Sequence, residues 1–407
     1  MRQQLRLASG AALTGLLCCT LGLTAAPSAV ASASVSVRAA SVLRPDGTED
    51  VFTRNGSDGH LIRSSLPAGG SWQVQDLTAA AGSPAPDANA TGLIDRDGVE
   101  HVLTQSGGRL YDTSQAAGSG SWQVKDTGAV SIAGNVAAVL RNDGTVDVFG
   151  RGNAGDLIQA SLAPGQAWQV YDLTEVVGSP RLLGSPAAVV RRDGTVDVYT
   201  HMASSDHLAE TYLQNGSWQV YNLSNSYAYD HWCLDPSGNC GDLKTSGSPS
   251  VTLRKDGTVD VFTETYLGAF SVDEGLTETY LPPGGSWNLY FLDHAKDPSP
   301  DISGSPTATV RPDGTVDVFS HRASDNHPGV STLPPGDRWH YYDFAHDYGT
   351  PATQNDAAVG FRKDGSEDVL LVDTSNGHLM EMVLPQGAGA YGWQKYDLTT
   401  QVGVPAL

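Results

Sequence analysis

The sequence predicts an all-β fold, a seven-bladed β-propeller made of four-stranded antiparallel blades. Three observations carry this prediction. An Asp-Gly pair recurs at seven regularly spaced positions along the chain, and a Trp follows each of these pairs 24 to 30 residues after its Gly. The 407 residues include 46 Gly and 22 Pro, while 40% are apolar, which suits many turns around a sizeable core.

The repeat has a period near 50 residues. The seven pairs are Asp46-Gly47, Asp97-Gly98, Asp143-Gly144, Asp193-Gly194, Asp256-Gly257, Asp313-Gly314 and Asp364-Gly365. The seven tryptophans are Trp72, Trp122, Trp168, Trp218, Trp287, Trp339 and Trp393. The copy at 184–223 shows four short β-rich runs separated by polar turns. A lone four-stranded sheet cannot cover its own faces, whereas seven sheets in a ring can, so a propeller is favoured over a stacked β-solenoid.

Each Asp-Gly pair is expected to lie in a three-residue hairpin loop with the Gly left-handed. An Arg two residues before the Asp and a second Asp four residues after it would share one face of the hairpin and form an ion pair. The pairs are Arg44/Asp50, Arg141/Asp147, Arg191/Asp197, Arg254/Asp260, Arg311/Asp317 and Arg362/Asp368. In the second blade both places change together, to Asp95 and His101, which argues for contact between them.

A calcium site in these loops is not expected. The pattern Asp-Gly-x-x-Asp resembles the calcium loops of integrin-type propellers, but in the third blade the first two ligand places hold Val139 and Arg141. Calcium needs several oxygen ligands, which these side chains do not supply. We expect no metal and no cofactor.

The unit Gly-Ser-Pro-x-Ala-x-x-Arg-x-Asp-Gly-Thr-x-Asp-Val-Phe, followed later by Trp-Gln-Val-x-Asp-Leu, resembles the repeats of bacterial lectins of the Photorhabdus type and of tectonin-like propellers. The resemblance spans residues 34–407 and implies sugar binding between blades, against aromatic side chains. It suggests Tyr111, Trp122, Trp168 and Trp218 as carbohydrate-binding residues. Packing between blades is the competing role for the tryptophans. The chain also looks like the stand-alone lectin subunits of streptomycete umbrella toxin particles.

Residues 1–33 read as a secretory signal peptide. Arg2 and Arg6 precede an apolar stretch, and small residues that suit cleavage follow at two overlapping sites, Ala29-Val30-Ala31 and Ala31-Ser32-Ala33. We therefore expect a secreted, monomeric propeller over 34–407 that does not insert into a membrane.

An insertion at about 224–246 breaks the repeat. It contains the aperiodic Trp232 and the two cysteines outside the leader, Cys233 and Cys240, which enclose a turn sequence. In an oxidising compartment a disulfide is favoured over zinc bound with His231. Tyr227, Tyr229 and Trp232 have no counterparts in the other repeats, so we expect them to bind a protein partner. The alternative is a disulfide-closed surface loop that binds no partner.

Charge and motifs narrow the function. The net charge of −21 disfavours nucleic acid and leaves neutral ligands or a basic partner. The sequence has no nucleophile elbow, zinc-protease motif or sialidase box, and its aspartates recur once per blade rather than as a unique catalytic pair. The expected function is that of a non-catalytic lectin that recognises cell-surface glycans between its blades. It would be the targeting subunit of an antibacterial toxin particle. The alternatives are a protein-docking adaptor and, less favoured, a secreted glycosidase.

Overall fold

The computed structural model describes residues 40–223, 243–267, 275–292, 302–353, 357–389 and 391–407. The chain divides into two compact units, Met1–Val35 and Ser36–Leu407, and every described residue belongs to the second. Among the described residues, no helix is long and apolar enough to cross a membrane.

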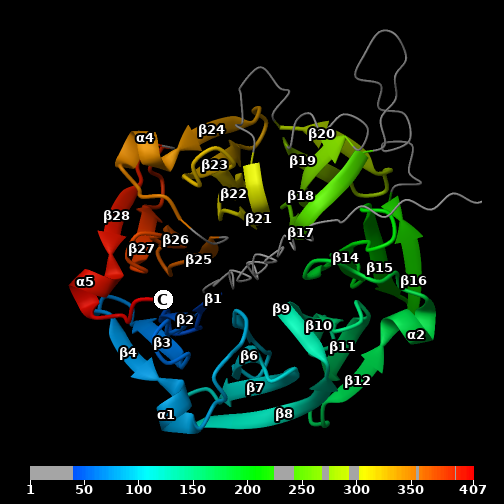
Figure 1. Ribbon diagram of the computed structural model, residues 1–407, viewed down its shortest axis with the longest axis horizontal. Helices are drawn as coiled ribbons and strands as arrows, with labels where there is room; N and C mark the ends of the chain where they lie inside the picture. The colour runs from blue at the N-terminus through cyan, green and yellow to red at the C-terminus, as the bar shows by residue number, and fades with distance from the viewer. Residues whose placement is uncertain (1–39, 224–242, 268–274, 293–301, 354–356, 390) are drawn as a thin grey trace, which may run out of the picture. The chain divides into compact units, whose positions relative to one another are not determined.

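Seven four-stranded antiparallel sheets form a ring, so the predicted seven-bladed β-propeller is confirmed (Figure 1). Each blade consists of four strands that are consecutive in the chain. The strands of blades 1 to 4 are β1 (Ala40–Leu43), β2 (Glu49–Arg54), β3 (Leu61–Leu66), β4 (Gln73–Asp76); β5 (Thr91–Ile94), β6 (Glu100–Ser106), β7 (Arg109–Gln115), β8 (Trp122–Val130); β9 (Ile132–Leu140), β10 (Val146–Gly152), β11 (Leu157–Leu162), β12 (Gln169–Asp172); β13 (Ala187–Val190), β14 (Val196–His201), β15 (Leu208–Gln214) and β16 (Ser217–Asn222). Those of blades 5 to 7 are β17 (Leu243–Leu253), β18 (Val259–Leu267), β19 (Gly275–Leu281), β20 (Asn288–Phe291); β21 (Ile302–Val310), β22 (Val316–Arg322), β23 (Pro328–Leu333), β24 (His340–Asp343); β25 (Ala358–Phe361), β26 (Glu367–Val372), β27 (Leu379–Leu384) and β28 (Gln394–Asp397).

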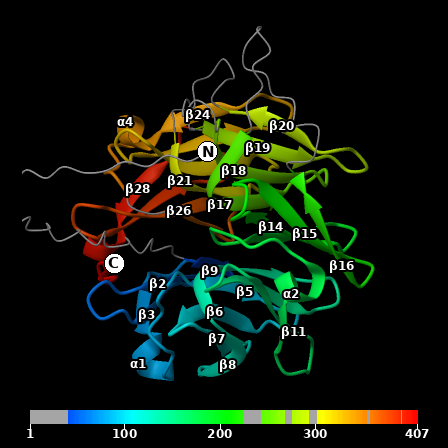
Figure 2. The same cartoon turned by 45° about the vertical axis from the view of Figure 1, so that its right-hand side comes forward.

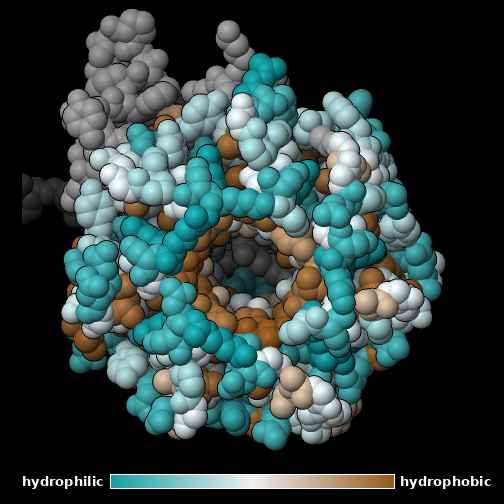
Figure 3. All heavy atoms as spheres, turned by 180° about the vertical axis from the view of Figure 1, so that it is seen from behind, coloured by the Kyte–Doolittle hydropathy of each residue, from teal (hydrophilic) through white to brown (hydrophobic). Residues whose placement is uncertain are grey.

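The first strand of each blade lies toward the ring centre and the fourth lies at the periphery (Figure 1). Figure 2 shows the same blades from an oblique angle, with the first strands clustered around the axis. The face seen from behind has a central hollow, and hydrophobic residues line its edge (Figure 3).

The predicted Asp-Gly hairpins are confirmed. In blade 1 the amide of Arg44 donates to the carbonyl of Thr48 (2.8 Å) and the amide of Gly47 donates to the carbonyl of Arg44 (2.9 Å). The seven hairpin glycines are all left-handed, with φ from +75° to +99°. A side chain at this position would be strained, which explains why the Gly recurs in every copy.

Within the described residues, four one-turn helices that the sequence did not predict follow the outermost strands of blades 1, 3, 6 and 7. They are α1 (Leu77–Ala81), α2 (Leu173–Val177), α4 (Phe344–Tyr348) and α5 (Leu398–Val402). Each begins after an Asp whose side chain accepts a hydrogen bond from a backbone amide of the first turn. Each ends at a Gly in the left-handed conformation. Five residues are too few to show a helical period in the sequence.

The C-terminal residues connect blade 7 to blade 1. The amide of Leu407 donates to the carbonyl of Gly377 (2.8 Å), and the amide of Gly56 donates to the carbonyl of Ala406 (3.1 Å). Val404 is buried with Val51 of blade 1 and Leu370 of blade 7 in one apolar cluster. These contacts join the two ends of the ring.

Candidate functional site

Clefts recur between neighbouring blades on the face that carries the Asp-Gly hairpins. Four of them lie at the blade boundaries 7/1, 2/3, 4/5 and 5/6, with cavity volumes of about 350 to 460 Å³. Because each cleft is made by the same positions of the repeat, the molecule presents several related sites.

Three segments are common to the four clefts, as the 5/6 cleft illustrates, and the 2/3 cleft has a further wall from residues 114–125 of blade 2. Arg254 and Lys255 come from the hairpin of blade 5, and Asp313 and Gly314 come from the hairpin of blade 6. The turn between the third and fourth strands of blade 6, which includes Pro335, forms the remaining wall. The cleft therefore combines charged groups, hydrogen-bonding groups and a rigid apolar wall, a composition typical of small-ligand sites.

A cation just before the Asp-Gly pair connects successive hairpins. The ammonium group of Lys363 donates to the carbonyl of Asp46 (3.2 Å), and Lys255 and Arg96 likewise donate to the carbonyls of Pro312 and Asn142. The stem of the cation passes over the hairpin glycine of the next blade, so that a Cβ atom on Gly47 would lie 2.2 Å from Cδ of Lys363. A glycine is thus required both for its φ and for the close approach of this side chain.

The predicted ion pairs form at the floor of the clefts. In blade 7, Nε of Arg362 lies 2.7 Å from Asp368, and Nη2 donates to Glu381 at 2.9 Å. The six predicted Arg–Asp pairs are all present. Arg44 and Arg311 also bind Glu100 and Glu367 of the following blade, so the ion pairs connect blades as well as hairpins.

Burial governs the titration of these carboxyl groups. It raises the pKa of Asp368 to about 10, that of Glu381 to about 7 and that of Glu210 to about 8. Repulsion from a neighbouring carboxylate adds to the shift of Asp368 and Glu210, while the arginine opposes it in each case. At neutral pH these shifts favour the protonated form of Asp368 and of Glu210.

Blade 2 has a different arrangement, as its coupled substitutions predicted. Nε2 of His101 lies 3.4 Å from Asp95, and Nδ1 lies 3.0 Å from Asp112. Burial disfavours the charged imidazole, but the hydrogen bonds and charges of Asp112 and Asp95 outweigh it and raise the pKa of His101. Asp95 and His101 both line the cleft at the 2/3 boundary.

The tryptophans pack between blades. Trp122 meets Phe52 of the preceding blade edge-to-face, with ring centroids 6.0 Å apart, and Trp218 meets Phe149 in the same way at 5.8 Å. Trp168 packs in the cluster that contains Leu103 of blade 2. The packing role considered for these residues is therefore confirmed.

The predicted carbohydrate-binding residues do not form one site. None of Tyr111, Trp122, Trp168 and Trp218 lines any of the four clefts. Tyr111 pairs in register with Asp126, four residues along β8 from Trp122. Their part in sugar binding stays a prediction. The predicted partner-binding residues Tyr227, Tyr229 and Trp232 and the Cys233–Cys240 disulfide lie outside the described residues.

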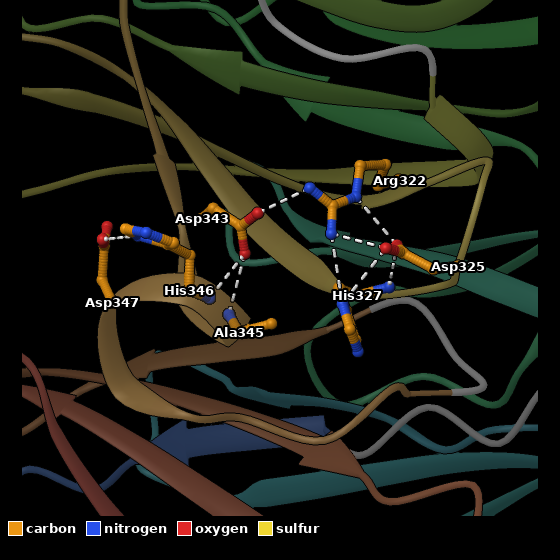
Figure 4. Close-up of polar contacts among 7 residues, drawn as sticks. All are labelled: Arg322, Asp325, His327, Asp343, Ala345, His346 and Asp347. Atoms are coloured by element: carbon orange, nitrogen blue, oxygen red, sulfur yellow. Dashed lines mark hydrogen bonds and ion pairs between the residues drawn. The ribbon is translucent and has the colours of Figure 1, made fainter.

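The opposite face carries ion pairs of a structural kind. In blade 6, Nη1 of Arg322 lies 2.7 Å from Asp343, whose other oxygen accepts the amides of Ala345 and His346 at the start of α4 (Figure 4). Arg322 also contacts Asp325 and His327. The cluster holds the turn before β23 against the helix, and its groups are engaged with one another. Among the described residues, no group of three or more His, Cys, Asp or Glu side chains is placed to hold a metal ion.

Sequence reasoning missed the walls of the clefts. The Leu-Pro-Pro-Gly turns at 281–284 and 333–336 and the related turns at 66–69 and 162–165 recur before the tryptophans. That recurrence, together with the cation before Asp-Gly, was the available signal. It does not by itself indicate which turns of neighbouring blades meet.

Comparison with solved structures finds similar propellers at low identity. The Aleuria aurantia lectin, described as a fungal lectin with a six-bladed β-propeller fold and a novel fucose recognition mode, is 12% identical, with a TM-score of 0.51 over 89% of this chain and 94% of that chain. AofleA from Arthrobotrys oligospora is 17% identical, with a TM-score of 0.45 over 76% and 87%. The polysaccharide lyase Uly1 is 12% identical, with a TM-score of 0.45 over 91% of both chains. These likenesses concern the fold. No family model matches the chain, and no match was found among curated proteins.

Proposed function

We propose that this protein is a lectin that binds neutral glycans in the recurring clefts between blades, without turning them over. The observation that carries the proposal is the recurrence of one cleft, with the same three building segments, at four blade boundaries. Repetition of a shallow site suits multivalent binding, in which several weak contacts add to a high avidity.

The chemistry of the clefts supports a sugar ligand. At the 4/5 boundary, the guanidinium of Arg191 and the carboxylate of Asp256 offer hydrogen bonds to hydroxyl groups, and Pro283 offers an apolar surface to the C–H face of a ring. The overall negative charge disfavours anionic polymers as ligands. The structural likeness to the Aleuria aurantia lectin is consistent with this proposal.

We infer binding without catalysis from how the carboxyl groups are used. The exposed aspartates that line the clefts, such as Asp256, recur once per blade in the hairpin turns, where Asp256 accepts the backbone amide of Thr258. The acids beneath the clefts, such as Asp197 and Asp260, are fully buried and paired with arginines. A glycosidase needs two carboxyl groups that reach opposite sides of a scissile bond. We therefore expect no release of reducing sugar from any bound glycan.

The test is a glycan array followed by calorimetric titration of the best ligand against a blocked cleft. Ala68 is exposed on the turn that walls the 7/1 cleft, so Ala68→Trp fills that cleft. We expect the number of sites per molecule to fall by one, while the control Ser57→Trp, at an exposed turn in blade 1 outside the four clefts, leaves it unchanged. Absence of any glycan hit, or unchanged stoichiometry in Ala68→Trp, overturns the proposal.

We further propose that the lectin is secreted after cleavage of residues 1–33 and serves as the targeting subunit of an antibacterial toxin particle. In this proposal the insertion at about 224–246 docks on a secreted protein. Pull-down from the native secretome with the wild type and with Tyr229→Ala/Trp232→Ala tests it. Recovery of the same proteins by both would contradict the docking role.

A further inference from the structure

The cleft between blades 2 and 3 presents the opposite charge at its floor to the other clefts. In three of the four clefts an arginine of the ion pair lines the floor: Arg362 at 7/1, Arg191 at 4/5 and Arg254 at 5/6, with side chains 22 to 28% exposed. The equivalent residue at the 2/3 boundary is Asp95, whose side chain is 18% exposed. A ligand therefore meets a carboxylate where the other clefts offer a guanidinium.

The buried partners of Asp95 are reorganised to match. Arg362 forms ion pairs with two buried acids, Asp368 and Glu381. Asp95 instead lies next to His101, whose other ring nitrogen contacts the buried Asp112. In blade 7 a cation faces the cleft and two acids lie beneath it. In blade 2 an acid faces the cleft, and a histidine and then a second acid lie beneath it. The hydrogen bonds and charges of Asp112 and Asp95 raise the pKa of His101 against the effect of burial, which favours a cation between the two acids.

Asp95 retains hydrogen-bonding capacity for a ligand. Its Oδ1 atom accepts the backbone amides of Asp97 (2.9 Å) and Val99 (2.8 Å), which fixes the orientation of the side chain. Its Oδ2 atom lies 3.4 Å from His101 Nε2, well beyond the usual length of about 2.7–2.9 Å for a charge-assisted hydrogen bond. A carboxylate oxygen accepts more than one hydrogen bond, so Oδ2 can accept from a donor in the cleft.

The rest of the cleft suits hydroxyl groups rather than a second positive charge. Ser114 and Gln123 line it and offer neutral hydrogen bonds. Its other charged residues, Asp97 and Asp143 against Arg96 and the exposed Lys125, balance in number. Arg96 also lines the cleft, but its guanidinium donates to the carbonyl of Asn142. The cavity of about 440 Å³ accommodates a single sugar ring.

We propose that the cleft between blades 2 and 3 is a distinct site for an amino sugar with one free, protonated amine, which Asp95 binds through Oδ2. The sugar hydroxyls contact Ser114, Gln123 and Lys125. This inference deepens the proposed function, since it assigns one cleft of the lectin a cationic ligand and leaves the arginine-floored clefts to neutral glycans.

The probes are the methyl glycosides of glucosamine and galactosamine and their N-acetylated counterparts, titrated by ligand-observed NMR at about pH 6, below the usual pKa of an alkyl amine. Asp95→Asn removes the charge but keeps the Oδ1 acceptor for the two amides. Asp95→Arg/His101→Asp restores the ion pair of the other blades, so it should fold. Asp256→Asn is the matched control, since it removes a carboxylate from the 4/5 and 5/6 clefts.

We expect the wild type to bind an amine glycoside at one site, at least tenfold more tightly than its N-acetylated form. Both Asp95 variants should lose this preference, and Asp256→Asn should keep it. Equal amine binding by Asp95→Asn, or neutral-glycan binding without amine binding by the wild type, overturns the inference. Amine binding that depends on Asp95 supports it even where no neutral glycan binds, an outcome that would contradict the proposed function alone.

Discussion

At the scale of single residues, the once-per-blade Trp is an anchor between blades. Five of the seven contact an aromatic ring of the preceding blade edge-to-face, with centroids 5.8 to 6.0 Å apart. The other two, Trp168 and Trp72, pack in the clusters that contain Leu103 and Leu370 at the same repeat position. The Trp is thus kept in every copy, while its partner varies between aromatic and aliphatic.

This difference predicts unequal effects of substitution at one contact. Trp218→Ala leaves a cavity between blades 3 and 4 and should lower the free energy of unfolding by about 3 kcal/mol. Phe149→Leu exchanges the ring for a side chain that the chain itself uses at this position and should cost less than about 1.5 kcal/mol. Urea denaturation followed by tryptophan fluorescence and circular dichroism measures both. Equal losses would show that Trp218 is not the dominant member of the contact.

At the scale of the hairpin, the Asp-Gly turn forms part of a contact between blades. Gly47 has φ +88°, and Lys363 of blade 7 passes over it to reach the carbonyl of Asp46. Gly69, in the other turn of the same blade on this face, is also left-handed at φ +70°, but a Cβ atom there would meet nothing within 4 Å. Comparing substitutions at the two glycines therefore separates the cost of the left-handed backbone from the cost of disturbing the contact between blades.

Both Gly47→Ala and Gly69→Ala should lower the free energy of unfolding by about 1–2 kcal/mol, because Ala is strained in the left-handed region. Gly47→Ala should lose more, since its methyl group displaces Lys363. In a Lys363→Ala background the two glycine variants should become equal, which a double-mutant cycle in urea measures. If the extra cost of Gly47→Ala persists without Lys363, the contact between blades does not account for it.

At the scale of the whole molecule, the repeat made the fold predictable and the clefts difficult to predict. The Asp-Gly and Trp periods indicated seven blades, and the coupled change to Asp95 and His101 indicated their contact. Each cleft, however, joins a hairpin of one blade to two turns of the next, and the sequence of one repeat does not specify how neighbouring copies are rotated. For the same reason Trp122 and Trp218, plausible as sugar-stacking residues, are found packed between blades.

The ring also contains a set of buried carboxyl groups that determines how its stability depends on pH. Burial raises the pKa of Asp197 to about 6, of Glu381 to about 7, of Glu100 and Asp260 to about 8 and of Asp368 to about 10. Nearby acids add to the shift at Glu100, Asp260 and Asp368. Unfolding returns each group to a value near 4, so over the intervening pH range the folded protein binds more protons than the unfolded chain.

The stability that these groups contribute should therefore be fully present below about pH 4 and fall as the pH rises toward 10. Each shifted group contributes about 1.4 kcal/mol per pH unit between its unfolded and folded pKa values. The melting temperature measured by calorimetry should be highest near pH 5 and at least about 5 °C lower at pH 9. Glu210→Gln is the matched variant, because Gln159 already occupies the equivalent place in blade 3, where it donates to Asp147 at 2.9 Å. This variant removes one titrating group with a pKa of about 8 and should flatten the decline between about pH 5 and 8. A melting temperature that rises from pH 5 to 9, or an unchanged slope in Glu210→Gln, would mean that these carboxyl groups are ionised in the folded ring.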